Sequence, residues 1–202
     1  MKDNFDYIFV GLGNPGAKYQ KTRHNIGWLA LYEFVLRNDK EFNQSAKLKA
    51  HQAKVKIGSK NILCLLPTTY MNNSGEAVRA AAKKYKVPTE NIIILVDEYN
   101  FPLGKVQLKI GGSAGGHNGL KSLLFHLDTD QFYKLRMGIS KNFGPGELVD
   151  YVLSEFTEEE WSGELTKSIL YTVRALHYIV QNTPQNAMSE INSGGLDNLK
   201  LD

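Results

Sequence analysis

The sequence predicts a single α/β domain built on a mixed β-sheet. Three observations lead to this fold class: 202 residues suit one domain, strand-like segments alternate with helix-like segments, and two neighbouring strand segments form a predicted hairpin. The alternation favours helices between strands, whereas the hairpin adds an antiparallel pair, so the sheet is expected to be mixed. The 42% hydrophobic and 22% charged fractions are those of an ordinary globular protein.

Short apolar or alternating runs bounded by turn residues predict the strands. They are Tyr7–Val10, Gln52–Ile57, Ile62–Leu66, Ile92–Val96, Val106–Ile110 and Leu135–Ile139. The turn sequence GSKN joins the second and third strands into the hairpin.

Helical patterns fill the segments between strands. The predicted helices are Ile26–Arg37, Gly75–Tyr85, Gly119–Leu127 and Glu158–Gln181. Asn73, three residues before Glu76, indicates a capping box at the second helix. In the last helix apolar residues recur at steps of three and four, and NTP ends it. The polar, glycine-bearing end predicts a domain over residues 1–192 and a loose C-terminal tail over residues 193–202.

Composition excludes several classes of protein. A net charge of +3 is too small to indicate nucleic-acid binding by itself, so any basic surface must be local. The single cysteine, Cys64, lies in the apolar run ILCLLP, which fits core packing and excludes a disulfide within the chain. With no signal-peptide pattern in MKDNFDYIF and no run of membrane-spanning length, we expect a cytoplasmic protein.

Residues 11–16, GLGNPG, match the dinucleotide-binding pattern G-x-G-x-x-G. That pattern requires a helix to begin at the third glycine, so that the pyrophosphate meets the helix N-terminus. Here AKYQKTRHN precedes the first helical segment, and at the distance of an acidic ribose ligand, about twenty residues on, the chain is still within the apolar helix IGWLALYEFVL. We therefore expect no dinucleotide site.

Residues 111–115, GGSAG, match the nucleophile-elbow pattern of α/β-hydrolases and make Ser113 a candidate nucleophile. An elbow needs a buried strand before it and a helix directly after it. The preceding KVQLKI alternates polar and apolar residues, which is typical of a half-exposed strand. A serine esterase is therefore a minor alternative, and Ser113 fits a glycine loop better.

Asparagines, histidines and one aspartate gather in loops beside the predicted strands and helices. They occur in NPG, TRHN, TTYMNNSG, VDE and GGHNG. If the first, third and fourth strands are parallel, several of these loops meet at one edge of the sheet.

These motifs together resemble the bacterial-type peptidyl-tRNA hydrolase family. The matching segments are VGLGNPGAKYQKTRHNIG, PTTYMNNSG, VDE, GGSAGGHNGLKS and KLRMGI, in the family's order between Tyr7 and Asn192. The resemblance implies one α/β domain of three layers, with a twisted mixed central sheet flanked by helices. It also implies a monomeric carboxylic ester hydrolase that cleaves the ester between a peptide and the 3′ ribose of tRNA, with peptidyl-tRNA as partner and neither metal nor other cofactor.

The resemblance identifies the functional histidine as His24, which suits an imidazole that takes a proton from water and returns it to the ribose oxygen. Asp97 is expected to hold His24 in its productive tautomer. Asn72 is expected to donate to the oxyanion, with Asn73 supplying the helix cap. The structural alternatives are helix capping by His24 or Asn72 and a turn-forming role for Asp97.

Substrate contacts are assigned to asparagines because an enzyme acting on all peptides must bind backbone amides. Asn14 and Asn118 are the expected contacts with the peptide and the tRNA 3′ end, and Asn72 is expected to bind substrate as well. The resemblance adds Tyr19 and Met71, although a methionine is more often a core residue. His117 is expected to be a neighbour of the site.

The resemblance maps a clamp for the tRNA 5′-phosphate onto Lys109 and Arg136. Both lie on strands whose alternate residues share a face. The neutral Gln107 weakens the expected positive charge, and a solvated charged surface is the alternative. Residues 143–160 are implied to form a lid, too acidic to bind phosphate. A non-catalytic RNA-binding relative is the alternative function, but it has no chemical need for His24, Asp97, Asn14 and Asn72 together.

Overall fold

The computed structural model describes residues 4–196, which form one sheet of seven strands in the order β2-β3-β4-β1-β5-β7-β6. The strands are β1 (Tyr7–Gly11), β2 (Asn43–Ser45), β3 (Ala50–Ile57), β4 (Lys60–Pro67), β5 (Ile92–Glu98), β6 (Val106–Ile110) and β7 (Tyr133–Gly138). The central strands β4, β1, β5 and β7 are parallel, and antiparallel pairs complete both sides, including the predicted β3–β4 hairpin. The prediction of a mixed α/β sheet is confirmed.

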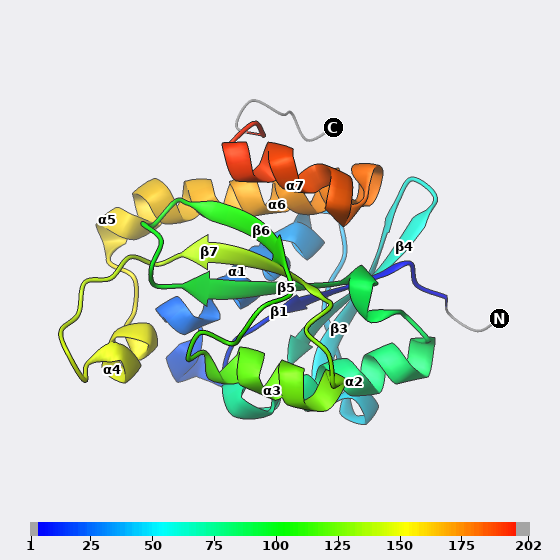
Figure 1. Cartoon of the computed structure of the whole chain (residues 1–202), viewed down its shortest axis with the longest axis horizontal. Coiled ribbons are helices and arrows are strands. Elements are labelled where there is room, and N and C mark those ends of the chain that lie inside the picture. The colour runs from blue at the N-terminus through cyan, green and yellow to red at the C-terminus, as the bar shows by residue number, and fades with distance from the viewer. Residues whose placement is uncertain (1–3, 197–202) are drawn as a thin grey trace.

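Helices cover both faces of the sheet (Figure 1). They are α1 (Ile26–Arg37), α2 (Ser74–Tyr85), α3 (Asn118–Leu127), α4 (Leu148–Leu153), α5 (Glu158–Glu160), a π-helical turn η6 (Trp161–Leu165), α6 (Thr166–Asn182) and α7 (Pro184–Ser193). Short 3-10 turns are η1 (Ala17–Tyr19), η2 (Arg23–Asn25), η3 (Ala46–Leu48), η4 (Met71–Asn73) and η5 (Thr89–Asn91). No helix within residues 4–196 is long and apolar enough to cross a membrane.

Two hydrophobic cores lie on the two faces, because successive residues of a strand point to opposite sides. On β1, Phe9 packs with α1 and α6 in the first core, whereas Ile8 and Val10 pack with α2 and α3 in the second core. On β7, Leu135 and Met137 join the first core, which leaves Lys134 and Arg136 on the opposite face. The parallel arrangement places the carboxyl ends of β4, β1, β5 and β7 at one edge of the sheet.

Helix α1 approaches this edge closely because Gly27 carries no side chain. A Cβ at Gly27 would lie 2.4 Å from the Leu95 carbonyl oxygen, and a Cβ at Gly11 would lie 2.5 Å from the Gly27 carbonyl oxygen. The glycines thus bring the start of α1 against β1 and β5. The η2 turn, which directly precedes α1, is held at the carboxyl end of the sheet.

Several short elements were absent from the sequence prediction. β2 is a polar segment of three residues that lacks apolar alternation and exists through its pairing with β3. α4 is six residues long. The helix predicted over Glu158–Gln181 is interrupted, because Gly163 has φ −109° and ψ −112° within η6. Pro184 ends α6 as expected but also occupies the first turn of α7.

The predicted domain boundary at residue 192 is too early for the described part of the chain. Asn192 accepts a hydrogen bond from the Leu108 amide at 2.7 Å and donates one to the Leu108 carbonyl at 3.0 Å. Leu196 is buried in the first core. The packed part of the chain therefore extends into the predicted tail, because the Asn192 side chain binds the Leu108 backbone and Leu196 is buried. Residues 197–202 of that tail lie outside the described residues.

The capping box predicted at α2 is also wrong. The Asn73 side chain makes no cap hydrogen bond, and Glu76 pairs with Lys49 instead. The turn η4 precedes α2 and changes the backbone geometry at the helix start. A capping box does occur at α5, between Thr157 and Glu160.

We predict that Gly27→Ala destabilises the protein, although alanine normally favours a helix over glycine. The added Cβ would overlap the Leu95 carbonyl, so α1 must move away from the sheet, at a cost of about 1–3 kcal/mol. Urea denaturation followed by circular dichroism measures the loss. Arg37→Ala, which breaks only an exposed ion pair in the same helix, is the control. A stability gain in Gly27→Ala would contradict the packing argument.

Candidate active site

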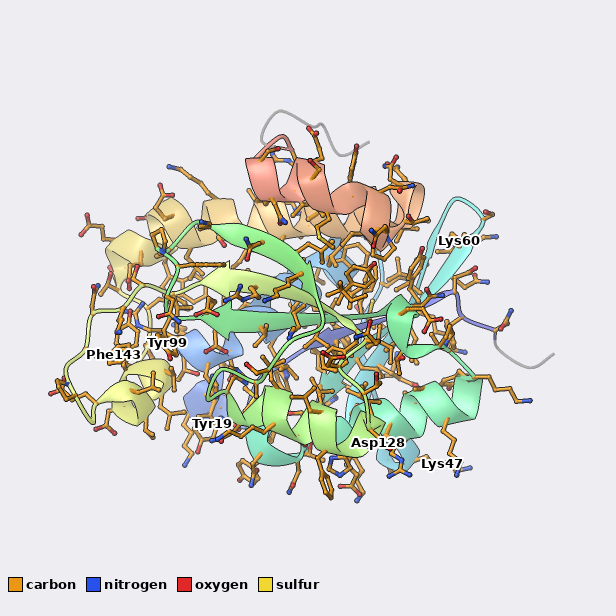
Figure 2. The ribbon with its side chains drawn as sticks, viewed as in Figure 1. Tyr19, Lys47, Lys60, Tyr99, Asp128 and Phe143 are labelled. Carbon is orange, nitrogen blue, oxygen red and sulfur yellow. The ribbon has the colours of Figure 1, made fainter. Side chains whose placement is uncertain are left out.

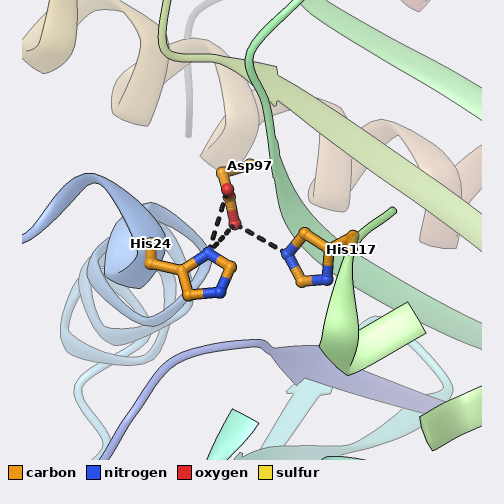
Figure 3. A group of neighbouring side chains, drawn as sticks. All are labelled: His24, Asp97 and His117. Carbon is orange, nitrogen blue, oxygen red and sulfur yellow. Dashed lines mark hydrogen bonds and ion pairs between the residues drawn. The ribbon is translucent and has the colours of Figure 1, made fainter. Parts of the chain in front are cut away.

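A carboxylate and two imidazoles from three separate elements meet at the carboxyl edge of the sheet (Figure 3). Asp97 lies near the end of β5, His24 lies in η2, and His117 directly precedes α3. His24 Nδ1 lies 3.0 Å from each oxygen of Asp97, and His117 Nε2 lies 2.9 Å from Asp97 Oδ1. The two rings are 4.7 Å apart between centroids. The residues are separated by up to 93 positions, so folding alone assembles the cluster.

The hydrogen-bond pattern fixes the tautomer of each ring. The Asp97 carboxylate can only accept, so His24 carries its proton on Nδ1 and leaves Nε2 as the lone-pair nitrogen. No described residue occupies His24 Nε2. His117 Nδ1 accepts from the Leu120 amide at 3.3 Å, so the proton of its neutral ring lies on Nε2 and is donated to Asp97. When both rings are neutral, the cluster thus has one available base, His24 Nε2.

Burial and charge act in opposite directions on these groups. Burial raises the pKa of Asp97, but the adjacent His24 and His117 outweigh it and hold that pKa well below the usual range. Burial lowers the pKa of His24, but the charge of Asp97 and its hydrogen bond outweigh this and place the pKa above its ordinary value. Asp97 therefore stays ionised, and its charge makes His24 a stronger base than an ordinary imidazole.

The loop formed by GLGNPG fixes the position of η2. The Asn14 amide donates to Asn25 Oδ1 at 2.9 Å, and Asn25 Nδ2 donates back to the Asn14 carbonyl at 3.0 Å. Asn14 Oδ1 in turn accepts from the Met71 amide at 2.9 Å, which joins this loop to η4. Gly13 lies against the Trp28 ring. Only the three-residue 3-10 turn η1 follows Gly16, and the first α-helix, α1, begins ten residues later at Ile26.

A pocket of about 170 Å³ connects the carboxylate with a basic surface. Asp97, His117 and the glycine loop line one part of it, and Lys109, Lys134 and Arg136 line another. The basic residues share one face because Lys109 pairs with Lys134 and Gln107 with Arg136 across β6 and β7.

Two of the three cations that line the pocket, Arg136 and Lys134, are engaged with neighbouring groups. Arg136 donates to Glu98 Oε2 and, at 2.9 Å, to Gln107 Oε1, and its guanidinium lies over the Phe101 ring. Lys134 donates to the Gly112 carbonyl at 3.1 Å. Burial, followed by Lys109 and Arg136, lowers the pKa of Lys134. The neutral Gln107 thus serves as an anchor for Arg136, a role that its sequence position did not reveal.

The structure separates the remaining predicted residues into buried and exposed positions. Met71 is buried in the second core against Gly119. Asn72 and Asn118 are exposed and make no hydrogen bond to His24 or Asp97 within the described chain. Tyr19 is half-buried under Lys18. Figure 2 shows Tyr19 at the same end of the molecule as Tyr99 and Phe143, the end toward which β5 and β7 run.

Ser113 lacks the environment of a serine nucleophile. It is exposed in the glycine loop, and no residue between 4 and 196 hydrogen-bonds to it. His117 lines the same pocket, but both of its ring nitrogens are already occupied. No base is therefore positioned for Ser113, and the esterase alternative fails.

The ligand atoms of His24, Asp97 and His117 lie within 4.8 Å of one another, a spacing that invites comparison with a metal site. A metal ligand must present a lone pair, but His117 Nε2 carries the proton donated to Asp97 while its Nδ1 accepts from Leu120. Metal binding would reverse this tautomer and leave the Leu120 amide facing another N–H. The donor set therefore fits a hydrogen-bonded relay better than a metal centre.

Sequence reasoning missed three roles in this site. His117 was expected only as a neighbour, yet it donates directly to Asp97. Asn25 was noted within TRHN without the function of locking Asn14. Glu98, within VDE, holds Arg136. The motifs contained all three residues, but their partners depend on strand register and loop conformation.

Comparison with known proteins gives consistent matches over nearly the whole chain. The family model described as peptidyl-tRNA hydrolase matches residues 8–199. A peptidyl-tRNA hydrolase of Gloeobacter violaceus is 40% identical over 186 residues, covering 92% of this chain and 93% of the relative. One from Geobacillus kaustophilus is 37% identical, covering 92% and 98%. The solved structure of the peptidyl-tRNA hydrolase from Acinetobacter baumannii has a TM-score of 0.87 at 31% identity, covering 95% and 97%.

We predict that Asp97→Asn lowers the pKa of His24. The substitution removes the charge that raises this pKa, while the burial that lowers it remains. Titration of the ring signals by nuclear magnetic resonance measures the change, with the His24 signal assigned from its absence in His24→Gln. His177, distant in sequence and bonded to the Val173 carbonyl, is the internal control. An unchanged or raised His24 pKa would show that Asp97 does not control this ring.

Proposed function

The chain belongs to the peptidyl-tRNA hydrolase family, and we propose that His24, oriented by Asp97, activates the water that cleaves its substrate. The protein hydrolyses the ester between a peptide and the 3′ ribose of tRNA and so recycles the tRNA. The observation that carries the proposed mechanism is the 3.0 Å contact between His24 Nδ1 and Asp97, with Nε2 unoccupied by any described residue.

In the proposed reaction, His24 Nε2 takes a proton from a water molecule while the oxygen of that water attacks the ester carbonyl carbon. The carbonyl becomes a tetrahedral oxyanion. When the bond to the ribose oxygen breaks, the imidazolium returns the proton to that oxygen, which leaves a free carboxyl group on the peptide and a hydroxyl on the tRNA. Asp97 remains ionised throughout and stabilises the positive ring.

His117 supports this reaction through Asp97. Its ring donates to Asp97 Oδ1 and caps α3 by accepting from Leu120, so it holds the carboxylate between two N–H donors. Two donors disperse the charge of a buried carboxylate and restrict its rotation.

Asn72 is the proposed oxyanion donor. It lies exposed in η4, next to Met71, whose amide is fixed by Asn14. A neutral amide donates to developing negative charge without titrating. Asn14 has its oxygen engaged, while no described residue bonds its Nδ2, so this N–H group is available to a peptide carbonyl. Asn118 and Tyr19 are proposed as further contacts, and Met71 supports the groove from the core.

Lys109 and Arg136 are the proposed clamp for the tRNA 5′-phosphate. They line one pocket with Asp97, which supports simultaneous binding of phosphate and of the ester end. Glu98 and Gln107 hold the Arg136 guanidinium in a fixed orientation, and Lys134 adds a third cation nearby. We propose further that the enzyme acts in the cytoplasm, where ribosomes release its substrate, and as a monomer, because one chain supplies the whole site.

We predict that His24→Ala reduces turnover of N-blocked aminoacyl-tRNA by about 100-fold or more, the effect of losing a general base. Binding of the tRNA should survive because the clamp residues are unchanged. Single-turnover release of the labelled amino acid measures the rate, and unblocked aminoacyl-tRNA tests the preference for peptidyl substrates. Ser113→Ala, in the pocket that Asp97 and His117 line, is the control and should retain its rate. Full activity in His24→Ala would remove this residue from the mechanism.

We predict that Lys109→Ala raises KM for a substrate carrying a 5′-phosphate and has little effect on one without it. A lost phosphate contact also makes binding less dependent on salt. The two substrates, compared at several salt concentrations, measure the effect. Lys60→Ala, on the hairpin at the opposite end of the molecule, is the control (Figure 2). An equal loss with both substrates would argue against a phosphate contact.

A further inference from the structure

The residue before His24 is a buried arginine whose side chain leads away from the pocket. Arg23 is 6% exposed and makes a two-pronged ion pair with Glu160, at 2.9 Å from Nη1 and 2.8 Å from Nη2. Its Nε donates to Ser154 Oγ at 3.3 Å. The guanidinium lies between two rings, 4.7 Å from the centre of Tyr151 and 4.8 Å from that of Phe156. Every part of the head group is thus held.

The backbone around Arg23 is attached to the same segment. The Arg23 amide donates to the Ser154 carbonyl at 3.0 Å, and Thr22 and Glu155 form an isolated antiparallel bridge. The Phe156 amide donates to the Lys21 carbonyl at 3.3 Å. Residues 151–160 therefore form an outer brace for the turn that carries His24.

The brace is itself anchored. The Tyr151 hydroxyl donates to the Ile139 carbonyl, just after β7. Glu160 closes the capping box of α5, accepting from the Thr157 amide at 2.8 Å. Burial raises the pKa of Glu160, but the hydrogen bonds from Arg23 and the Thr157 amide outweigh it and lower the pKa, so the ion pair is charged.

His24 therefore lies between two fixed neighbours. Asn25 ties η2 to the Asn14 loop on one side, and Arg23 ties it to residues 151–160 on the other. We propose that Arg23 and Glu160 are positioning residues for catalysis, which hold the His24 ring in line with Asp97. This inference rests on the proposed role of His24 as the base.

Energetics favour positioning over simple stabilisation. A buried ion pair contributes little net stability, because desolvation offsets the attraction, and an apolar pair of similar size would serve the fold as well. A planar guanidinium held by two oxygens and two rings instead fixes direction. Catalytic geometry tolerates errors of about 0.5 Å, and a shift of about 1 Å at the reacting atoms can cost about 100-fold in rate.

The test compares Arg23→Lys and Glu160→Gln with two matched controls. Lysine keeps the charge but loses the two-pronged contact and the stacking, and glutamine keeps the shape but loses the charge. Arg37→Lys and Glu164→Gln alter exposed ion pairs and serve as controls. We expect each test variant to lower kcat about tenfold or more while KM changes less than about twofold, since the substrate contacts are untouched. The downfield proton resonance of His24 Nδ1–H should weaken or shift in both variants and stay unchanged in the controls.

A double substitution separates positioning from stability. If Arg23 acts through His24, Arg23→Lys should cause no further loss in the His24→Ala background. Three results would overturn the inference. They are a wild-type kcat in both test variants, an equal further loss of kcat in the His24→Ala background, and a loss of kcat that only follows the unfolded fraction. If Arg23→Lys fails to fold, the kcat of Glu160→Gln tests the inference alone. Full activity of His24→Ala alone would instead refute the proposed function, so the two failures are distinguishable.

Discussion

The site depends on one constraint, the ionised carboxylate of Asp97 buried at the end of β5. A buried charge is costly unless it is paired and hydrogen-bonded. Asp97 is 7% exposed and obtains its pairing from two imidazoles that belong to η2 and to the start of α3. Those two loops must therefore converge on the strand end. The same pairing that offsets the burial of the carboxylate also raises the pKa of His24, so stability and chemistry are linked in one contact.

Convergence requires backbone segments to approach more closely than side chains normally allow. Gly11 and Gly27 let β1, β5 and α1 meet, and the Leu12 amide donates to the Leu95 carbonyl at this point. Gly11 and Gly13 of the dinucleotide-like motif thus serve close packing, whereas Gly16 has open space around it and a φ of 108°. At the second glycine cluster, Gly112 is held from both sides by Asp130 and Lys134, which fixes one end of the pocket rim. The two lookalike motifs have different causes: Gly11 allows a close backbone approach, whereas Gly111, Gly112 and Gly115 adopt positive φ values of 66°, 87° and 55°.

Most of the fold was predictable from sequence because it depends on local patterns, whereas the site residues were expected through the family resemblance of their motifs. The bounds of β6 and α1 match the prediction, since alternation and helical spacing define them without help from distant residues. β2 was missed because pairing with β3 creates it, and α7 was missed because Pro184 indicates a helix end as readily as a helix start. His24 and Asp97 followed from their motifs. The partners of the two arginines could not be predicted in this way. Those of Arg136 depend on the register of β6 on β7, and those of Arg23 lie 131 to 137 positions further along the chain.

The two ends of the pocket have opposite charge, and the fold must keep them from neutralising each other. Asp97 on β5 and Arg136 on β7 lie on adjacent strands, and a direct ion pair between them would take Asp97 from His24 and Arg136 from Glu98. Glu98 prevents this by holding Arg136, while Gly112 engages Lys134 and the two imidazoles occupy Asp97. Asp97, Arg136 and Lys134 thus each have their own partners, and residues 97 and 98 point to opposite sides of β5 where the strand ends. This separation keeps the carboxylate that pairs with His24 apart from the cations that are proposed to bind phosphate.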